Sequence, residues 1–474
     1  MKPLILLILL FPSYSNASLF QKIYQGYQAS DRLKEIELNQ KFTELDYVIG
    51  KKQYDWTLDT TFQFQDSFLE ALFAFQGQKT VTESLGFTLS RPSYKYGTFS
   101  ISNTQTIYDL SNWTASNLNS FTSEQIFQSR NSLSYEYEFL NKSLQIDWEI
   151  VHIQNLANKT QDRLRTEQDH YDFFTAYVTA KHKIQLHKLY KEFEKRAKDR
   201  VSQISRRVRD GLSRNVDLDQ ARLSLINQQE TIVTNKSELR LAVATIEDIV
   251  GISLPEKDYK LVNWSFKPAQ KNYPFLLDQP DFVELKNLKA QNELAEANIK
   301  KADENSDSSL TLNLSYTKNS FDEESSQALA DSVGPSPRDE KIVSLNYTLP
   351  IGVSRRDAVK EKLVLQRNMT RLNLKNRESD LKVRHRVLLE NIERFESAIK
   401  LINNKVNVAQ RVVKENKRLY LRGQITFEES LRAEETWIQA RISKVNMLLA
   451  LENAFSELAL ITGEIKPFLR DYRD

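Results

Sequence analysis

The sequence predicts a mainly α-helical protein that also contains β-strands and consists of two tandem structural repeats. Three observations support this prediction. Two long stretches are almost free of Gly and Pro, short segments alternate apolar and polar residues, and similar positions in the two halves lie 212 residues apart. Periods of two and 3.6 residues distinguish strands from helices. Each half is therefore expected to combine strands with a hairpin of long helices.

Residues 1–17 have the features of a secretory signal peptide. A single Lys precedes an apolar run from Leu4 to Phe11, and small residues end at Ala17. The run is shorter than the ~20 residues that a membrane-spanning helix needs, and no later segment has a long uninterrupted apolar stretch. If the mature chain crosses a membrane, we expect it to do so as a β-barrel.

The composition narrows the possible classes of protein. The chain of 474 residues has no Cys, which excludes a disulfide framework, a thiolate nucleophile and a Cys-based metal site. It has only 11 Gly and 11 Pro, and its mean hydropathy is -0.53. The formal net charge is +3, with basic and acidic residues interspersed. Long solvated helices are thus expected rather than a large globular core, and no basic stripe indicates a nucleic-acid partner.

The first strands are expected within residues 54–140. Segments 54–64 and 131–140 alternate polar residues with Tyr, Phe, Trp or Leu, which is typical of strands. Between them, 79–90 and 97–108 resemble a further hairpin. The first half is therefore predicted to have four strands, and the sequence leaves open whether the inner hairpin joins the wall of a barrel.

The second half is expected to have two strands within residues 308–350, at 309–317 and 341–350. Such two-sided strands fit either a soluble sheet or a membrane barrel with one face toward lipid and one toward water. Polar stretches between the strands are expected to be loops: 66–78, 109–130 and 319–340.

Each half continues with a long helix, a turn at one glycine and a returning helix. Because Gly and Pro disfavour helix interiors, their absence predicts long helices at 141–210 and 353–422, each roughly 100 Å long at 1.5 Å per residue. The returning helices are expected at 217–250 and 428–462. Apolar residues recur every seven positions there, which predicts coiled-coil packing; in the first helix they are Leu218, Leu225, Ile232, Leu239 and Ile246.

A constant offset relates the two halves. Three pairs of small residues are each separated by 212 positions: Gly211 and Gly423, Ala221 and Ala433, Gly251 and Gly463. This spacing indicates a tandem duplication. The first structural repeat is predicted at 18–251, a linker at 252–280 and the second repeat at 281–474.

Three segments resemble the TolC-type outer-membrane efflux protein family. They are DGLSRNVDLDQARLSL at 210–225, LYLRGQITFEESLRAEE at 419–435 and SLNYTLPIGVSRRDA at 344–358. The resemblance covers nearly the whole mature chain. It implies a trimeric transmembrane β-barrel continuous with a long periplasmic α-helical barrel. In that architecture strands from three subunits close one barrel, which removes exposed sheet edges.

The resemblance also implies a function. Members of the family are passive exit ducts in the Gram-negative outer membrane, in tripartite efflux or type I secretion systems. Their expected partners are two further subunits, outer-membrane lipid, a periplasmic adaptor protein and an inner-membrane transporter, without an enzymatic activity or a cofactor. The cargo stays open, as does a barrel of 12 or 18 strands. The alternative from another class is a periplasmic coiled-coil envelope scaffold without a channel.

By resemblance, the two turns form the periplasmic tip at which the adaptor docks. The tip residues are Gly211, Leu212, Ser213, Gly423, Gln424, Ile425 and Thr426. The glycines also have a structural explanation, because a tight turn favours a residue that tolerates positive φ.

The resemblance further implies a gate that closes the tip. Asp217 and Tyr420 match residues of the closing network, and Glu429 matches a carboxylate of a ring around the three-fold axis. Two positions depart from the family pattern, because Ile425 replaces an arginine and Arg432 replaces a second ring acid. Closing contacts are therefore expected from other arginines, with Arg209, Arg214 and Arg422 as candidates. Alternatively, the acids near Glu429 form a solvated first helical turn that the helix dipole favours.

No sequence pattern indicates a catalytic, cofactor or metal site. The five histidines have no metal-ligand spacing, and neither a phosphate-binding loop nor a dinucleotide fingerprint occurs. The energy for any transport is therefore expected to come from a partner.

Overall fold

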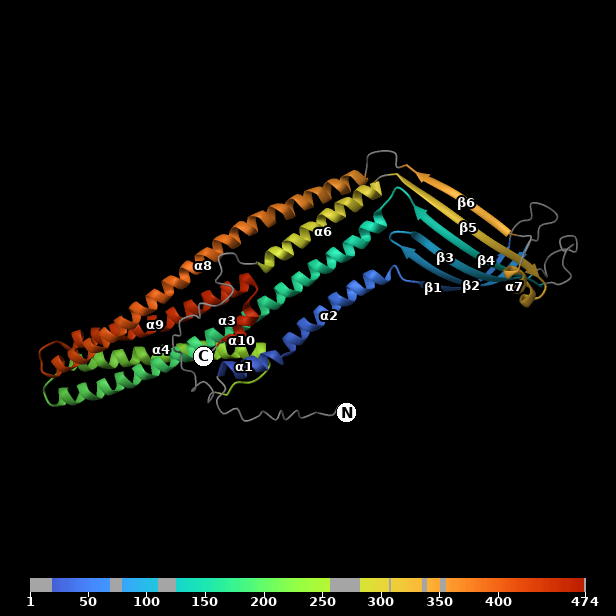
Figure 1. Ribbon diagram of the computed structural model, residues 1–474. Coiled ribbons are helices and arrows are strands. Elements are labelled where there is room, and N and C mark those ends of the chain that lie inside the picture. Colours follow the sequence, from blue (N-terminus) through green and yellow to red (C-terminus); the bar gives the residue numbers. More distant parts are fainter. Residues whose placement is uncertain are drawn as a thin grey trace, which may run out of the picture. The chain divides into compact units, whose positions relative to one another are not determined.

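The computed structural model describes residues 19–68, 79–109, 125–255, 282–306, 308–334, 339–349 and 355–472. Along the chain (Figure 1), two helices lead into four strands and a helical hairpin. A further helix, two strands flanking a short helix, a second helical hairpin and a C-terminal helix follow. The predicted signal peptide and all but residues 252–255 of the predicted linker lie outside the described residues.

The described strands form one antiparallel sheet in sequence order, β1-β2-β3-β4-β5-β6. The strands are β1 (Thr57–Phe68), β2 (Lys79–Ser93), β3 (Gly97–Asp109), β4 (Gln125–Glu138), β5 (Ser309–Asp322) and β6 (Asp339–Thr348). Strands β2 and β3 form the inner hairpin whose place the sequence left open. This hairpin pairs with β1 on one side and β4 on the other. It is therefore an integral part of the sheet.

The predicted loops are shorter than the sequence suggested. Strand β1 extends to Phe68, β4 begins at Gln125, and β5 extends to Asp322. The prediction of a loop over 319–340 was also wrong because a helix, α7 (Ser325–Val333), lies there. Cross-strand bonds between polar side chains, such as the 2.7 Å bond from Gln105 to Ser129, support pairing in stretches that are too polar to look like strands.

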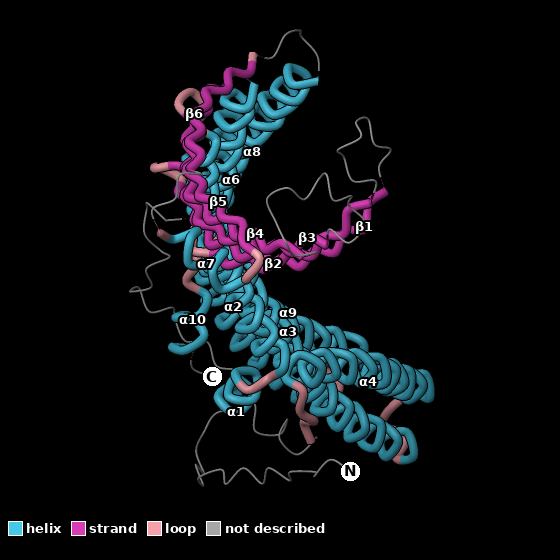
Figure 2. The backbone as a smooth tube through the Cα atoms, turned by 90° about the vertical axis from the view of Figure 1, so that its right-hand side faces the viewer, coloured by secondary structure: helices cyan, strands magenta, loops and turns pink. Residues whose placement is uncertain are grey.

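The two faces of the sheet differ in polarity. Residues that face one another across antiparallel strands point to the same side. One row is apolar, with Leu58 beside Leu89, then Ile101, Leu133 and Tyr316. The next row is polar, with Asp59 beside Thr88, then Ser102, Ser132 and Thr317. The sheet itself is curved (Figure 2).

The apolar face of the sheet is exposed in the single chain. Phe62, Phe68 and Val343 have exposed fractions of 72%, 73% and 73%. A soluble protein rarely leaves such a large apolar area uncovered. The sheet thus needs a partner surface on this face.

The long helices have nearly the predicted bounds. Helices α3 (Ser143–Arg209) and α8 (Arg355–Leu421) each have 67 residues, and they are followed by α4 (Asn215–Val250) and α9 (Phe427–Thr462). The remaining helices are α1 (Leu19–Gln28), α2 (Asp31–Lys52), α6 (Val283–Ser306) and α10 (Ile465–Asp471). Buried residues of the predicted heptads include Ala221, Ile246 and Ala440, as coiled-coil packing requires.

The chain divides into two compact units that cut across the two repeats. One unit comprises residues 1–41, 159–287 and 374–474, and the other comprises 42–158 and 288–373. The first contains both helical turns and the second contains the sheet. The predicted repeats therefore do not coincide with the compact units.

Within the described residues, one helix is long and apolar enough to cross a membrane. This helix is α9, and 50% of its most apolar window is buried in the protein. Its Trp437 packs with Phe193, Leu189 and Ala409 from the other hairpin helices. Such packing is typical of a core helix.

Candidate functional site

The two helical turns have the same backbone conformation. Gly211 and Gly423 have φ values of 71° and 75°, in the left-handed region. A Cβ at either position would meet no atom within 4 Å. The backbone conformation, rather than a shortage of space, thus explains the glycine at each turn. The predicted docking residues around them are mostly exposed, as Leu212 is at 63%.

The first turn leads into α4 through an ion pair. Arg214 is the N-cap residue of α4 and has an extended backbone conformation. Its backbone N–H donates to the Asp217 carboxylate at 3.3 Å, and its guanidinium donates to the same group at 3.2 Å. Asp217 is buried, with 7% of the residue exposed. The carboxylate thus stabilises the start of α4.

The second turn leads into α9 through a capping box. The Thr426 hydroxyl accepts a hydrogen bond from the Glu429 N–H at 3.2 Å, and the Glu429 carboxylate accepts one from the Thr426 N–H at 2.9 Å. These bonds satisfy donors that a helix N-terminus leaves free. Arg432 pairs with Glu428 one turn away at 2.6 Å.

A bridge joins the two hairpins directly below the turns. The hydroxyls of Ser213 and Tyr420 lie 2.9 Å apart. The Arg207 guanidinium lies 5.1 Å from the centre of the Tyr420 ring and donates to Ser213 at 3.2 Å. It also donates to the backbone oxygen of Leu421 at 3.3 Å. Arg207 therefore contacts both turns.

An apolar cluster lies beneath this bridge. Ile204 and Ala221 from the first hairpin pack with Tyr420 and Phe427 from the second. The ring centres of Tyr420 and Phe427 are 5.7 Å apart. The polar bridge is thus supported by residues of both repeats.

The structure brings together some of the predicted gate residues and separates others. Tyr420 bonds to Ser213, whereas the Asp217 carboxylate bonds to Arg214. Glu429 is exposed and folds back onto its own helix. The ring of carboxylates and the closing role of these residues stay predictions.

Sequence reasoning did not identify Arg207. Of the three candidate arginines, Arg214 has a side-chain contact at the turn, while Arg209 and Arg422 have no side-chain bond to another described residue. A usable signal was present, because Arg207 lies in the last turn of α3, where cations commonly bind free carbonyls.

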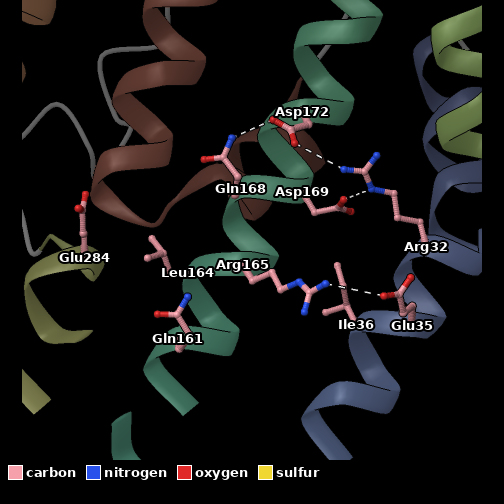
Figure 3. A pocket seen from close by; sticks show the side chains of 10 residues that line it. All are labelled: Arg32, Glu35, Ile36, Gln161, Leu164, Arg165, Gln168, Asp169, Asp172 and Glu284. Carbon is pink, nitrogen blue, oxygen red and sulfur yellow. Dashed lines mark hydrogen bonds and ion pairs between the residues drawn. The ribbon is translucent and has the colours of Figure 1, made fainter. Parts of the chain in front are cut away.

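A second candidate site is a charged pocket of about 490 Å³ beside α2 and α3 (Figure 3). Arg32 contacts Asp169 and lies 3.5 Å from Asp172, and Arg165 lies 3.7 Å from Glu35. The two arginines of the pocket thus pair with three of its four carboxylates, and the fourth, Glu284, pairs with Arg377. The charged groups of the pocket are therefore engaged in ion pairs with one another or with Arg377.

Buried polar groups next to this pocket connect the N-terminal helices to α3. The Tyr27 hydroxyl donates to Asp169 at 2.6 Å and lies 2.8 Å from Nδ1 of His170. Burial lowers the pKa of His170 to about 4, partly opposed by the charge of Asp169. Burial also raises the pKa of Glu167, whose carboxylate accepts the Ile465 N–H at 3.1 Å. These contacts tie both ends of the chain to α3.

Within the described ranges, no group of three His, Asp or Glu residues lies close enough to hold a metal ion. The histidines of the described residues pack against other side chains or form hydrogen bonds. For example, His182 lies 2.8 Å from Asn446.

Known proteins resemble this chain in structure and not detectably in sequence. No family model and no curated protein sequence matches it. The outer-membrane protein VceC of Vibrio cholerae superposes with a TM-score of 0.67 at 11% identity, covering 94% of this chain and 96% of VceC. The Campylobacter jejuni CmeC outer-membrane channel gives 0.66 at 13% identity, covering 94% and 85%.

A third structure is similar along the whole chain. The open state of the Neisseria gonorrhoeae MtrE outer-membrane channel gives a TM-score of 0.64 at 14% identity, covering 94% of this chain and 88% of MtrE. Coverage of this extent includes both the strands and the helical hairpins. The chain has the fold that the sequence resemblance predicted, that of the TolC-type outer-membrane channels.

Proposed function

We propose that the protein is an exit duct in the outer membrane of a Gram-negative cell, formed by three copies of the chain. The observation that carries the proposal is the sheet, which has one polar face and one largely exposed apolar face that helix α7 covers only over β4 and β5. Lipid against the apolar face and water against the polar face would satisfy both. The chain's similarity in fold to outer-membrane channels supports the same assignment.

The edges of the sheet support closure by neighbouring subunits. In six consecutively antiparallel strands, the first and last run in opposite directions. Edge β6 of one subunit can therefore pair with edge β1 of the next in an antiparallel manner. Three such sheets form a barrel of 18 strands, within the range of outer-membrane barrels. This closure removes two long edges that would otherwise invite aggregation.

We assign the helical turns to the periplasmic tip. In this assignment the bridge of Arg207, Ser213 and Tyr420 holds the two hairpins together in the closed state. A periplasmic adaptor binds the exposed turn residues, and an inner-membrane transporter supplies energy. The duct itself is passive, without catalysis or a cofactor.

The runner-up is an envelope scaffold built from the same coiled coils. A scaffold has no use for a sheet whose apolar face is exposed, as Leu345 is at 61%. It would also not require detergent for extraction, whereas a barrel would.

The test is single-channel recording from the purified protein in planar bilayers. We expect discrete currents and cation selectivity, which Glu429→Ala reduces if three such carboxylates line the pore. Glu415→Ala, which removes an exposed carboxylate of α8 that pairs with Arg418, is the matched control. A folded trimer that never inserts would contradict the duct. Insertion with unchanged selectivity in Glu429→Ala would keep the duct and remove Glu429 from the constriction.

A further inference from the structure

The helix α7 is fixed on the apolar face of the sheet by hydrogen bonds. The Ser332 hydroxyl lies 2.9 Å from the Ser129 hydroxyl and accepts from the Asn131 amide at 2.8 Å. The Lys318 ammonium donates to the Gly334 carbonyl at 2.8 Å. Ser129 and Asn131 are four and two residues from Leu133 on β4 and therefore share its face. Figure 2 shows α7 on the outer side of the curve of the sheet.

The polar side chains beneath α7 form one network on this face. Gln105 donates to Ser129 at 2.7 Å, and Asn103 donates to Asn131 at 2.6 Å. Such groups would be costly against hydrocarbon, because lipid offers them no hydrogen bonds. Helix α7 packs over the β4 and β5 side of this network, where its Ala328 and Ser332 are fully buried. The helix is thus held by polar contacts on a face that is otherwise apolar.

A groove of about 430 Å³ lies between α7 and the neighbouring strands. Five large apolar side chains supply most of its surface: Phe62, Leu85, Ile107, Phe127 and Leu329. The remaining lining residues are polar: Glu83, Ser84, Gln105, Thr106, Ser325 and Ser326. Phe62 and Leu85 are opposite each other in the register of β1 and β2, on the same face as Leu58 and Leu89. The lining therefore continues directly into the exposed apolar face of the sheet.

We propose that this groove binds one acyl chain of an outer-membrane phospholipid, with α7 as its fixed wall. The inference rests on the proposed function, which places this face against lipid. An acyl chain fits the apolar lining, and the groove opens onto the surface that bulk lipid would cover. Polar groups of its lining, including Glu83, Ser325 and Ser326, can contact the headgroup. Each trimer would then bind three lipids.

The test is native mass spectrometry of the delipidated trimer titrated with a dioleoyl phosphatidylethanolamine. We expect up to three bound lipids. Leu329→Trp fills the groove and is expected to weaken their binding roughly tenfold or more. The matched control is Val333→Trp, which adds the same side chain on the same helix at a residue that is 72% exposed and does not line the groove.

Equal binding by the wild type and by Leu329→Trp would overturn the proposal. Equal weakening in both variants would overturn it as well, because the effect would then not belong to the groove. Planar-bilayer recording of the same samples separates this result from the proposed function. Channels that conduct without retaining lipid leave the duct in place, whereas a trimer that never inserts contradicts the duct itself.

Discussion

The two helical turns lie 212 residues apart and use different side chains to reach the same backbone conformation. The offset of 212 residues pairs Arg214 with Thr426 and Asn215 with Phe427. Arg214 offers no hydroxyl to cap α4, whereas Thr426 caps α9. Asn215 is exposed and Phe427 is buried. The difference teaches that one turn geometry is compatible with different side chains, because the second repeat buries an aromatic ring at the position where the first exposes an Asn.

Replacing Phe427 should have the largest effect on the tip. Phe427→Ala removes a side chain that is 3% exposed, and such deletions cost about 3–5 kcal/mol. Hydrogen exchange of the turn amides should report a lower free energy of local opening. The equivalent change in the first repeat, Asn215→Ala, should stay within about 0.5 kcal/mol. Equal effects would mean that Phe427 and Asn215 contribute equally to the stability of their turns.

The repeats also differ in buried charge along their long helices. Asp169 and His170 correspond by the offset to Leu381, which is buried, and Lys382, which is exposed. Asp169 and His170, with Tyr27 and Arg32, therefore form a titratable cluster that the matched positions of α8 lack. Lys466 of the second repeat is a more distant charge that also acts on His170.

This difference predicts a pH-dependent stability in the first repeat. The pKa of His170 is lowered to about 4, so the unfolded chain binds a proton near pH 6.5 while the folded chain does not. The free energy of unfolding should therefore fall as pH drops from 6.5 to 4, by up to about 3 kcal/mol. Protection factors of α1 amides should show the loss. His170→Asn should reduce the slope, and Lys382→Gln should leave it unchanged.

The raised pKa of Glu167 acts in the opposite direction. Its folded form binds a proton more readily than the unfolded form, so its contribution to stability falls as pH rises. The comparison between wild type and His170→Asn isolates the histidine, because both contain Glu167. A slope that His170→Asn leaves intact would assign the effect to another group.

The turn glycines should behave alike despite these differences. An Ala at Gly211 or Gly423 meets no atom within 4 Å but must adopt a positive φ, which costs roughly 1–2 kcal/mol. Local opening of each turn by hydrogen exchange should shift by the same amount within error. A clearly larger cost at one turn would indicate a contact that exists only when a partner is bound.

Much of this architecture could be predicted from the sequence because both halves contain the same order of strands, long helix, turn and returning helix. The stretches without Gly or Pro, together with the 212-residue offset, predicted the bounds of the long helices to within two residues, as α3 and α8 show. Helix α7 was missed because it has only nine residues, most of them polar or small, and contacts with the sheet, not local propensity, stabilise it. Likewise, Arg207 gains its role only where two hairpins distant in sequence meet.

The caps provide a finer comparison of the two turns. Thr426→Ala removes the hydroxyl that accepts the Glu429 N–H, with an expected cost of about 1 kcal/mol. Arg214→Ala removes no side-chain acceptor that caps the helix. It removes only the exposed partner of the ion pair with Asp217, so the free energy of local opening should fall by a few tenths of a kcal/mol. Hydrogen exchange in the first turn of α9 and of α4 checks both. The reverse order of effects would show that the ion pair is the stronger cap.

The bond that joins the two repeats should have an effect similar in size to that of the Thr426 cap. Tyr420→Phe keeps the ring against Phe427 and removes only the hydroxyl bonded to Ser213, at about 0.5–1.5 kcal/mol. In planar bilayers this should raise the open probability, because the bond can act only while the hairpins are together. Ser213→Ala should have a similar effect, and the double variant should add little, since one interaction cannot be lost twice. Fully additive effects would mean that each hydroxyl acts through a different neighbour, in which case Arg207 rather than the Ser213–Tyr420 bond would connect the repeats.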